Sequence, residues 1–296
     1  MNTFDSPSRR VFNVVNYIIL IGTGLTCLVP FVNLFAISFS NSGAAAAGKV
    51  VFWPVGFTLS SYEFAISNGR FFPALFVSIK RLVLGVGTNL IFMIMAAYPL
   101  SKTKQQFRAR NIFMVYFVIT MVIGGGLIPT YILVTKLKLL NSIWALILPG
   151  ALPVWTMVIL MNFMRQMPQD IEEAAIVDGA GVWRRLFGVM LPLLKPALAT
   201  VALFCAVWHW NDWFWGLIYM QSPTNYPLQT YLQTLLLKME ELLRIAGTDY
   251  MKLLSMLSVR TGRAAQLFMG AFPMMILYPF LQKYFTKGLV MGSVKG

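Results

Sequence analysis

The chain has 296 residues, of which 58% are hydrophobic and only 11% are charged, and its mean hydropathy is +0.70. Soluble proteins carry about 25% charged residues, so this composition excludes an ordinary soluble domain and predicts one integral membrane domain. The net charge of +14 does not indicate nucleic-acid binding, because the basic residues lie mainly between apolar runs, where lipid headgroups and topology account for them. Cys27 and Cys205 lie inside apolar stretches without metal-ligand spacing, so both are expected to be packing residues and no metal site is predicted.

Six apolar stretches are long enough to cross a bilayer, which takes about 20 residues of helix. The first is about twice as long as the core of a secretory signal, which has about 7–15 apolar residues, so we expect it to be a retained membrane helix. The sequence thus predicts an all-α membrane protein with six transmembrane helices. They are expected at residues 12–38, 76–100, 112–134, 143–164, 196–220 and 264–284.

The loop at residues 101–111 sets the expected orientation, because it carries Lys102, Lys104, Arg108 and Arg110 and no acidic residue. Short loops rich in Lys and Arg stay in the cytoplasm. Both termini and the segment between the fourth and fifth spans are therefore expected to be cytoplasmic. The expected organisation is a single membrane domain at 1–296, with a core at about 72–286, a cytoplasmic hairpin at 168–192, and outer caps at about 41–72 and 221–262.

Glycine and proline interrupt the third expected span at Gly124, Gly125, Gly126 and Pro129. Proline removes a backbone donor and kinks a helix. Lipid tolerates such a break only where neighbouring helices or polar cavities satisfy the freed carbonyl groups. The cluster is either a hinge in a protein that alternates between states or an instance of the Gly and Pro that are common in membrane helices.

Residues 168–192 form a polar insert between two apolar spans, in which Pro168 is expected to end the preceding helix and a new helix to follow. Asp170 is expected to cap this helix, with Glu173 reaching back to complete a capping box. Ala174 and Ala175 are good helix formers that let another backbone approach closely. Gly179 can take the left-handed conformation that ends a helix.

A second short helix is expected after Gly179, before Leu191 and Pro192 return the chain to the membrane. Its spacing predicts an apolar side and a basic side, the latter with Arg184 and Arg185. The expected apolar side consists of Val182, Trp183, Leu186, Phe187 and Met190. A compact helix–turn–helix of this kind is stiff enough to carry force.

Aromatic and polar side chains gather near the outer end of the fifth expected span. Trp and Tyr at that depth are explained by an aromatic belt, whereas Asp inside a span is costly and faces a cavity or the bundle interior. Aromatic faces with amide and acid partners also suit a sugar, so a substrate path or gate and a structural network both remain open. His209 alone is expected to be a packing residue. The candidate residues are Trp208, Trp210, Asn211, Asp212, Trp213 and Tyr219.

The hairpin spacing E-A-A-x3-G-x9-V-x-L-P over residues 173–192 resembles the signature loop of bacterial ABC-importer permeases. Six fixed identities at about 5–10% each make a chance match rare. With residues 209–213 and the ending at 279–296, the chain is similar to permeases of the carbohydrate-uptake class, especially the smaller maltose-system permease and the polysaccharide and oligosaccharide subgroup. The resemblance covers essentially the whole chain. Val189 departs from it, because the family commonly has isoleucine there.

This resemblance implies the type I ABC importer permease fold in the bacterial inner membrane, and import of an oligosaccharide by alternating access. The chain itself would be non-catalytic, with ATP and Mg bound by two partner ATPase subunits. Further implied partners are a second, non-identical permease subunit, an extracytoplasmic solute-binding protein and membrane lipid. The residues that would couple to the ATPase are Asp170, Glu173, Ala174, Ala175, Asp178, Gly179, Leu191 and Pro192.

The expected outer segments are rich in basic residues against few acids. These basic residues are Lys49, Arg70, Lys80, Arg81, Lys136, Lys138, Lys238, Arg244, Lys252, Arg260 and Arg263. They can indicate an acidic oligosaccharide such as a uronate polymer, drawn in by long-range attraction, or an acidic face of the binding protein, or nothing. The alternative to an importer is an ion-coupled carrier or channel, which predicts paired charges near the bilayer centre and inverted repeats, and neither is found. A membrane-embedded enzyme would need a catalytic set, which one His and spans nearly free of acids do not supply.

Overall fold

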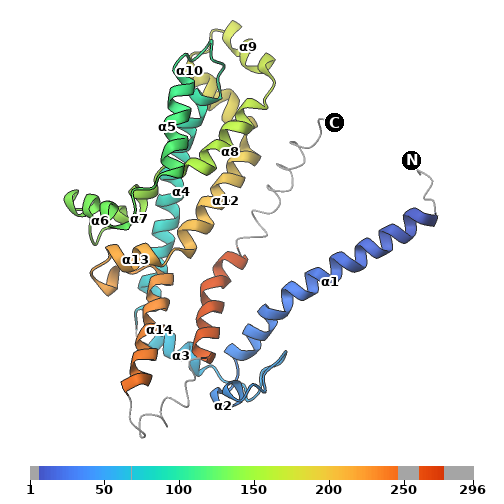
Figure 1. The fold of residues 1–296 in the computed structure, drawn as a ribbon, viewed down its shortest axis with the longest axis vertical. Coiled ribbons are helices and arrows are strands. Elements are labelled where there is room, and N and C mark those ends of the chain that lie inside the picture. Colours follow the sequence, from blue (N-terminus) through green and yellow to red (C-terminus); the bar gives the residue numbers. More distant parts are fainter. Residues whose placement is uncertain (1–6, 68, 246–259, 277–296) are drawn as a thin grey trace. The chain divides into compact units, whose positions relative to one another are not determined.

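The computed structural model describes residues 7–67, 69–245 and 260–276, and these residues form helices joined by turns and short irregular segments (Figure 1). No described residue lies in a strand, in agreement with the all-α prediction. The chain divides into two compact units. The first contains Met1–Asn68 and Thr234–Ala271, and the second contains Gly69–Gln233 and Phe272–Gly296.

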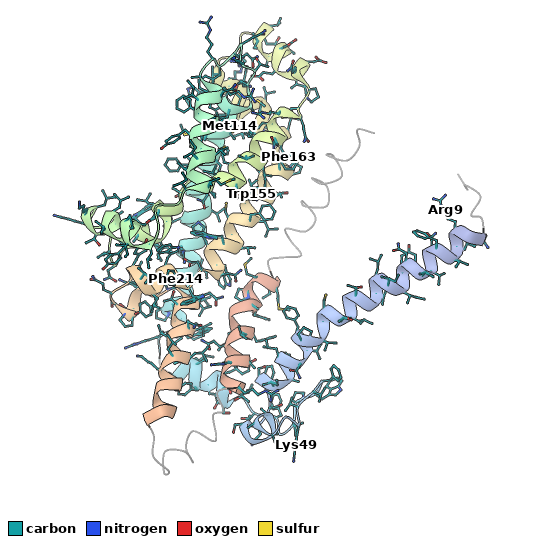
Figure 2. The ribbon with its side chains drawn as sticks, viewed as in Figure 1. Arg9, Lys49, Met114, Trp155, Phe163 and Phe214 are labelled. Carbon is teal, nitrogen blue, oxygen red and sulfur yellow. The ribbon has the colours of Figure 1, made fainter. Side chains whose placement is uncertain are left out.

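The first unit is dominated by the long helix α1 (Pro7–Ser38), followed by α2 (Ser42–Ala46), α3 (Ser60–Ser67) and residues 260–271 of the helix at 260–276. Within α1, the most apolar stretch has no buried residue in the structure, and its side chains stand free in Figure 2. Such a helix needs lipid or another protein around it. At its C-terminal end, Phe35 makes an edge-to-face contact with Phe268, and in the following α2 the Ala45 carbonyl accepts from Arg260 at 2.9 Å.

The second unit is a helical bundle in which α4 packs against both α8 and α12 (Figure 1). These three helices lie side by side although they come from distant parts of the sequence. The elements in chain order are α4 (Phe71–Ser101), α5 (Arg110–Val122), α6 (Leu127–Lys136), α7 (Ile143–Ile147), η1 (Leu148–Gly150), α8 (Val154–Arg165), α9 (Gln169–Val177), α10 (Val182–Arg184), the π-helical segment η2 (Arg185–Met190), α11 (Leu191–Leu193), α12 (Lys195–Asn211), α13 (Phe214–Tyr219), η3 (Pro223–Asn225) and α14 (Leu228–Ile245), whose later residues belong to the first unit.

The expected spans are present as helices, but most of them are broken. By length and apolarity, α1 and α4 can each cross a membrane alone, and up to five crossings result if each bent pair of helices counts as one. The third expected span is wrong as a single helix, because α5 and α6 meet at 110°. The fourth is bent by 54° between η1 and α8, and the fifth is interrupted at Asp212. The sixth expected span begins in the helix at 260–276, and its remainder lies outside the described residues.

The glycine triplet accounts for the sharpest of these breaks. Ile123 follows α5 with an extended backbone, and Gly126, which precedes α6, has φ of +76°, a conformation that residues with a Cβ rarely adopt. Pro129 lies in the first turn of α6, where no intrahelical N–H is lost. Pro129 therefore costs no helical hydrogen bond at this turn.

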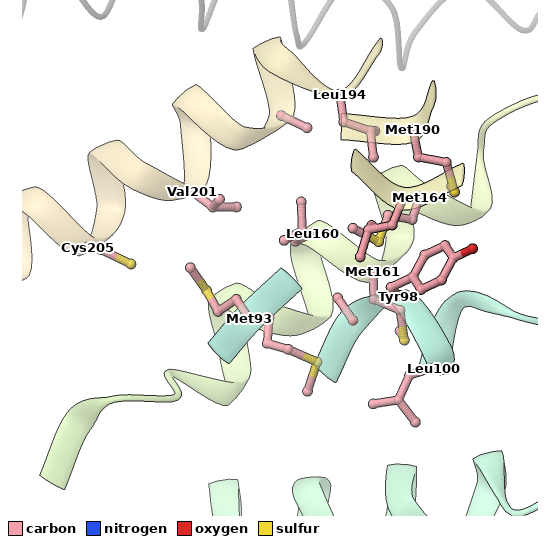
Figure 3. Packing of buried hydrophobic residues seen from close by; sticks show 14 residues of the cluster. Met93, Tyr98, Leu100, Leu160, Met161, Met164, Met190, Leu194, Val201 and Cys205 are labelled. Atoms are coloured by element: carbon pink, nitrogen blue, oxygen red, sulfur yellow. The ribbon is translucent and has the colours of Figure 1, made fainter. Parts of the chain in front are cut away.

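The core of the second unit is a cluster of apolar side chains from α4, α8, η2 and α12, several of them methionines (Figure 3). Met93, Leu160 and Val201 are completely buried in it, and Met114 and Phe163, labelled in Figure 2, pack against it. Lipid tails are as apolar as these side chains, so cohesion comes from close packing rather than from removing water. Cys205 is buried here as expected, whereas Cys27 is exposed on α1. The expectation that Cys27 packs in a core is therefore wrong for this structure.

Asn89 of α4 joins two other helices through its side-chain amide. Its Nδ2 donates to the carbonyl oxygens of Gly150 at 2.7 Å and of Ala151 at 2.9 Å, which lie at the break before α8. With both amide hydrogens directed at carbonyl groups, Oδ1 must be the atom that faces His209 Nε2 at 2.7 Å. His209 therefore donates to Asn89 and is the buried packing residue that the sequence predicted.

Close approach between α4 and α12 depends on Gly85. A Cβ at this position would fall on the imidazole ring of His209, whereas a Cβ at Gly87, half a turn away, would meet nothing within 4 Å. Small residues let membrane helices approach closely, and the Asn89–His209 hydrogen bond lies one turn further along the same contact. Gly85 thus sets the distance at which the polar contact forms.

Arg81 of α4 forms a buried ion pair that the sequence analysis did not find. Its guanidinium is 0% exposed and donates to the Asp212 side chain at 2.5 Å and to the Asp212 backbone carbonyl at 3.0 Å. That carbonyl belongs to the residue directly after α12, and Oδ1 of Asp212 accepts from the Trp215 N–H of α13 at 3.3 Å. The expectation that Arg81 belongs to a free basic outer segment is therefore wrong: it is held at the break between α12 and α13.

Gly85 gives a direct test of the helix contact. We expect Gly85→Ala to lower the thermal unfolding midpoint of the detergent-solubilised protein, because overpacking costs about 1–3 kcal/mol. Gly87→Ala is the matched control, and it should leave the midpoint unchanged or raise it, since alanine favours the helix by about 1 kcal/mol over glycine. The midpoints are measured by intrinsic tryptophan fluorescence during heating. Equal midpoints for the two variants would contradict the close approach of α4 and α12.

Candidate functional site

The hairpin between α8 and α12 lies at one end of the bundle, where Figure 1 shows α9 and α10 beyond the ends of α4 and α8. Its first helix begins at Gln169, so Pro168 takes the capping position and no side chain caps the helix. The predicted capping box of Asp170 and Glu173 is therefore wrong: the helix starts two residues too early for it. Asp170 and Glu172 instead lie in the first turn, where their charges favour the positive end of the helix dipole.

The end of α9 is a Schellman motif, as the glycine predicted. Gly179 has φ of +74°, and its N–H donates to the Ile176 carbonyl at 3.0 Å, while the Ala180 N–H donates to the Ala175 carbonyl at 2.9 Å. These two bonds satisfy carbonyl groups that the helix end would otherwise leave free. The turn between the two helices of the hairpin is therefore fixed by backbone hydrogen bonds.

Glu172 attaches the hairpin to the end of α4. Both of its carboxylate oxygens accept from Lys102 Nζ, and the Tyr98 hydroxyl donates to it at 3.3 Å. The ammonium also lies over the Tyr98 ring, 4.1 Å from its centroid. Burial lowers the pKa of Lys102, and the hydrogen bond to Glu172 opposes this shift.

Sequence reasoning selected Glu173 and missed Glu172, although the two carboxylates are neighbours. Glu173 is exposed, whereas Glu172 is half-buried and precedes the buried Ala175 by three residues. This helical spacing places Glu172 on the same inner face as Ala175. The sequence alone does not show that Ala175 is buried, so it could not select Glu172. The hairpin thus has an inner face that is bonded to the end of α4 and an outer face that is exposed in the isolated chain.

The predicted coupling residues lie mostly on the outer face. Those that are exposed are Asp170, Glu173, Ala174, Asp178, Gly179 and Pro192. Ala175 is buried against the bundle and Leu191 is half-buried, so these two hold the hairpin rather than face outward. Val177 belongs to the outer face too and is 86% exposed. An apolar side chain this exposed beside small residues is typical of a contact surface.

The second half of the hairpin departs from the predicted amphipathic helix. Leu186 and Met190 are buried, but Trp183 and Phe187 are exposed and stack on each other with ring centroids 5.9 Å apart. Arg185, expected on the opposite side from the apolar residues, turns inward to within 3.9 Å of Glu172. The cause is the π-helical segment from Arg185 to Met190, which changes the spacing at which side chains share a face.

The aromatic stretch at 208–219 divides into buried and accessible side chains. Trp210 and Tyr219 are buried, and Asp212 is held by Arg81. The ring of Trp208 lies against Gly150, where a Cβ would come within 3.1 Å of it.

Three of the six candidate residues in this stretch remain accessible in the described part of the chain. Asn211 is exposed at the last turn of α12, and Trp208 and Trp213 are each about two-fifths exposed. These three lie within one turn of the break at Asp212. A polar amide between two partly exposed indoles can present both a hydrogen-bonding group and flat apolar surface to a ligand.

Residues 89–290 match the family model described as binding-protein-dependent transport system inner membrane component. The chain is 36% identical to protein LplC of Bacillus subtilis over 99% of this chain and 97% of that protein. It is 33% identical to the polygalacturonan/rhamnogalacturonan transport system permease protein YtcP of the same organism, over 97% and 99% of the two chains. A solved structure of a bacterial ABC transporter involved in import of the acidic polysaccharide alginate superposes with a TM-score of 0.80 at 31% identity, covering 96% of this chain and 100% of that one.

These matches extend over almost the whole chain and include the hairpin, the broken spans and the aromatic stretch. The fold is that of a type I ABC importer permease, as the resemblance implied, and the apolar helices agree with a membrane location. The chain therefore belongs to the family of inner-membrane components of binding-protein-dependent transport systems.

Proposed function

We propose that this chain is the permease subunit of an ATP-driven importer that takes an oligosaccharide from an extracytoplasmic binding protein and passes it across the inner membrane by alternating access. Family membership supports the dependence on a binding protein. The carbohydrate cargo is supported by the names of YtcP and of the alginate importer, both of which act on polysaccharides. The feature that carries the proposal is the hairpin, which is fixed on its inner face and open on its outer face.

The hairpin is the element through which we expect ATP hydrolysis in a partner subunit to move this chain. Its outer face offers small residues, Ala174 and Gly179, beside the exposed Val177, which suits insertion into a cleft. Glu173 and Asp178 add exposed carboxylates at the same surface. Two ATPase subunits would bind ATP and Mg, and this chain would contribute no catalytic group.

The inner attachment explains how a pull on the hairpin would reach the membrane. Glu172 is bonded to Lys102 at the end of α4, and Leu186 and Met190 are buried in the core that α4, α8 and α12 share. A displacement of the hairpin is therefore transmitted to three helices at once. A flexible connector would absorb the same displacement.

Residues 1–296 form one permease domain in this proposal, with six spans, both termini in the cytoplasm and a core at about 72–286. The basic loop at 101–111 supports the orientation. The outer segments at about 41–72 and 221–262 are where the binding protein would dock. A second, non-identical permease subunit completes the pathway, and the bend at Gly124–Gly126 would be a hinge within it.

The sugar would contact the accessible members of the aromatic stretch. Trp208, Asn211 and Trp213 are the exposed members of the candidate set, whereas Trp210 and Tyr219 are buried and Asp212 is half-buried, and these three would hold the break in shape. The stretch thus combines both interpretations that the sequence left open. One half would serve as substrate path or gate and the other half as structural network.

We further propose that the oligosaccharide is acidic. Basic residues outnumber acidic ones in the expected outer segments, and YtcP and the alginate importer are named for polysaccharides that contain acidic sugars or are described as acidic. Arg81 does not contribute to this attraction, because Asp212 already neutralises it. The proposal therefore rests on residues such as Lys136 and Lys138, which are exposed.

Gly179 tests the coupling role. Valine at φ of +74° is strained. We therefore expect Gly179→Val to reduce both uptake and binding-protein-stimulated ATPase activity about tenfold, which corresponds to a free-energy change of about 1.4 kcal/mol. Gly181→Val is the matched control, because Gly181 has φ of −63° and open space around it. Normal uptake and ATPase association in Gly179→Val would exclude the coupling role, and uptake that proceeds without the ATPase would favour an ion-coupled carrier.

The break at Asp212 gives a paired prediction. Asn211→Ala should raise the sugar concentration needed for half-maximal uptake and leave the thermal unfolding midpoint unchanged, because Asn211 is exposed. Asp212→Asn should instead lower the midpoint, since it leaves Arg81 unpaired and breaking a buried pair costs about 3–5 kcal/mol. If Asn211→Ala changes only stability, the substrate contact at this position is refuted.

The acidic cargo is tested with oligomers of equal length. An oligogalacturonate should stimulate the ATPase activity of the complex with its binding protein, and a neutral oligogalactan should not. The stimulation at limiting sugar should fall as ionic strength rises, because salt screens exposed charges beyond about 10 Å at 0.1 M. Equal stimulation by the neutral oligomer would exclude an acidic specificity while leaving the importer proposal intact.

A further inference from the structure

A cavity of about 520 Å³ lies between the end of α4, the turn that follows it and the hairpin. It lies at the end of the candidate membrane span α4, which finishes at Ser101. None of the roles proposed above uses it. The residues that line it are Met95, Tyr98, Pro99, Lys102, Gln106, Phe107, Glu172, Ile176, Val182, Trp183, Arg185 and Leu186.

One wall of the cavity continues the apolar surface of α4. Met95 lines the cavity and is 53% exposed. Ile91 and Phe92, one turn earlier on the same helix, are also exposed apolar residues. Side chains three or four residues apart share a helix face, so an acyl chain lying along α4 reaches the cavity without leaving apolar surface.

The opposite wall carries more positive than negative charge. Lys102 and Arg185 face a single carboxylate, Glu172, which is the one acidic residue among the described lining residues. Lys102 already bonds both oxygens of that carboxylate. Arg185 approaches it only to 3.9 Å, and its buried Nε has no hydrogen-bond partner in the described part of the chain. Arg185 is therefore a cation with donors left for another anion.

We propose that this cavity binds an anionic phospholipid, with the phosphate at Arg185 and an acyl chain along the apolar wall of α4. Basic pockets between membrane helices on the cytoplasmic side are suited to such headgroups, and Trp183 on the cavity wall is a residue type that favours the interface. The side of the membrane rests on the orientation in the proposed function, whereas the lipid class rests on the cavity alone. A soluble phosphate would use the cation and leave the apolar wall bare.

The test is native mass spectrometry of the purified importer complex titrated with phosphatidylglycerol or phosphatidylcholine of identical acyl chains. We expect phosphatidylglycerol to be retained in preference to phosphatidylcholine, and Arg185→Gln to weaken that retention about fivefold. Arg184→Gln is the matched control: it removes the same charge from the neighbouring exposed residue, which does not line the cavity, and should retain the lipid as the wild type does.

A second pair of variants keeps the test valid if Arg185→Gln folds poorly. Gln106 lines the cavity, and its Oε1 accepts the Thr103 N–H at 3.2 Å. Gln106→Glu preserves that acceptor and places a negative charge in the cavity, so phosphatidylglycerol retention should fall. Gln105→Glu adds the same charge outside the cavity and should have no effect.

Three results would overturn the proposal. They are equal retention of the two lipids, equal loss in the cavity and control variants, and displacement of phosphatidylglycerol by inorganic phosphate alone. Because lipid retention is measured without ATP or sugar, these outcomes do not depend on transport. A complex that retains the lipid yet fails to transport would count against the proposed function and leave the lipid site standing.

Discussion

The structure depends on α4 satisfying backbone groups that other helices leave free. Inside a membrane no water is present to bond a carbonyl group that a broken helix exposes. Asn89 supplies two donors to the break before α8, and Arg81 supplies one to the break after α12. The breaks in the fourth and fifth spans persist because an intact neighbouring helix carries the missing donors.

The same helix also holds the hairpin. Lys102, the residue directly after α4, bonds Glu172, while Asn89 lies about 20 Å away along the helix and Arg81 about 12 Å beyond that, at about 1.5 Å per residue. One helix therefore contacts the hairpin at its end, the break before α8 near its middle, and the break after α12 in its first half. Since packed helices behave as rigid elements over such distances, α4 is placed to carry motion from the hairpin to the aromatic stretch in the proposed function.

Sequence reasoning located elements whose signals are local. The hairpin, the left-handed Gly179 and the burial of His209 followed from residue types and spacing, because capping and turn chemistry act within a few residues. The breaks before α8 and after α12, the partners of Arg81 and the role of Glu172 did not follow, because each depends on a residue more than 60 positions away in the chain. The π-helical segment was also missed, since no periodic pattern predicts its changed spacing.

One signal in the sequence pointed to these long-range contacts. Ser78, Arg81, Gly85 and Asn89 recur every three or four residues within an apolar span, which marks one face of α4 with polar or small residues. Such a face is costly against lipid and has to meet protein instead. In the structure each of the four meets a separate feature: the Leu228 N–H, the Asp212 pair, the His209 ring and the Gly150 carbonyl. We therefore interpret the Arg81–Asp212 pair as part of this structural face of α4 and not as the ion-binding site of a coupled carrier. Both partners already bond each other at the break after α12.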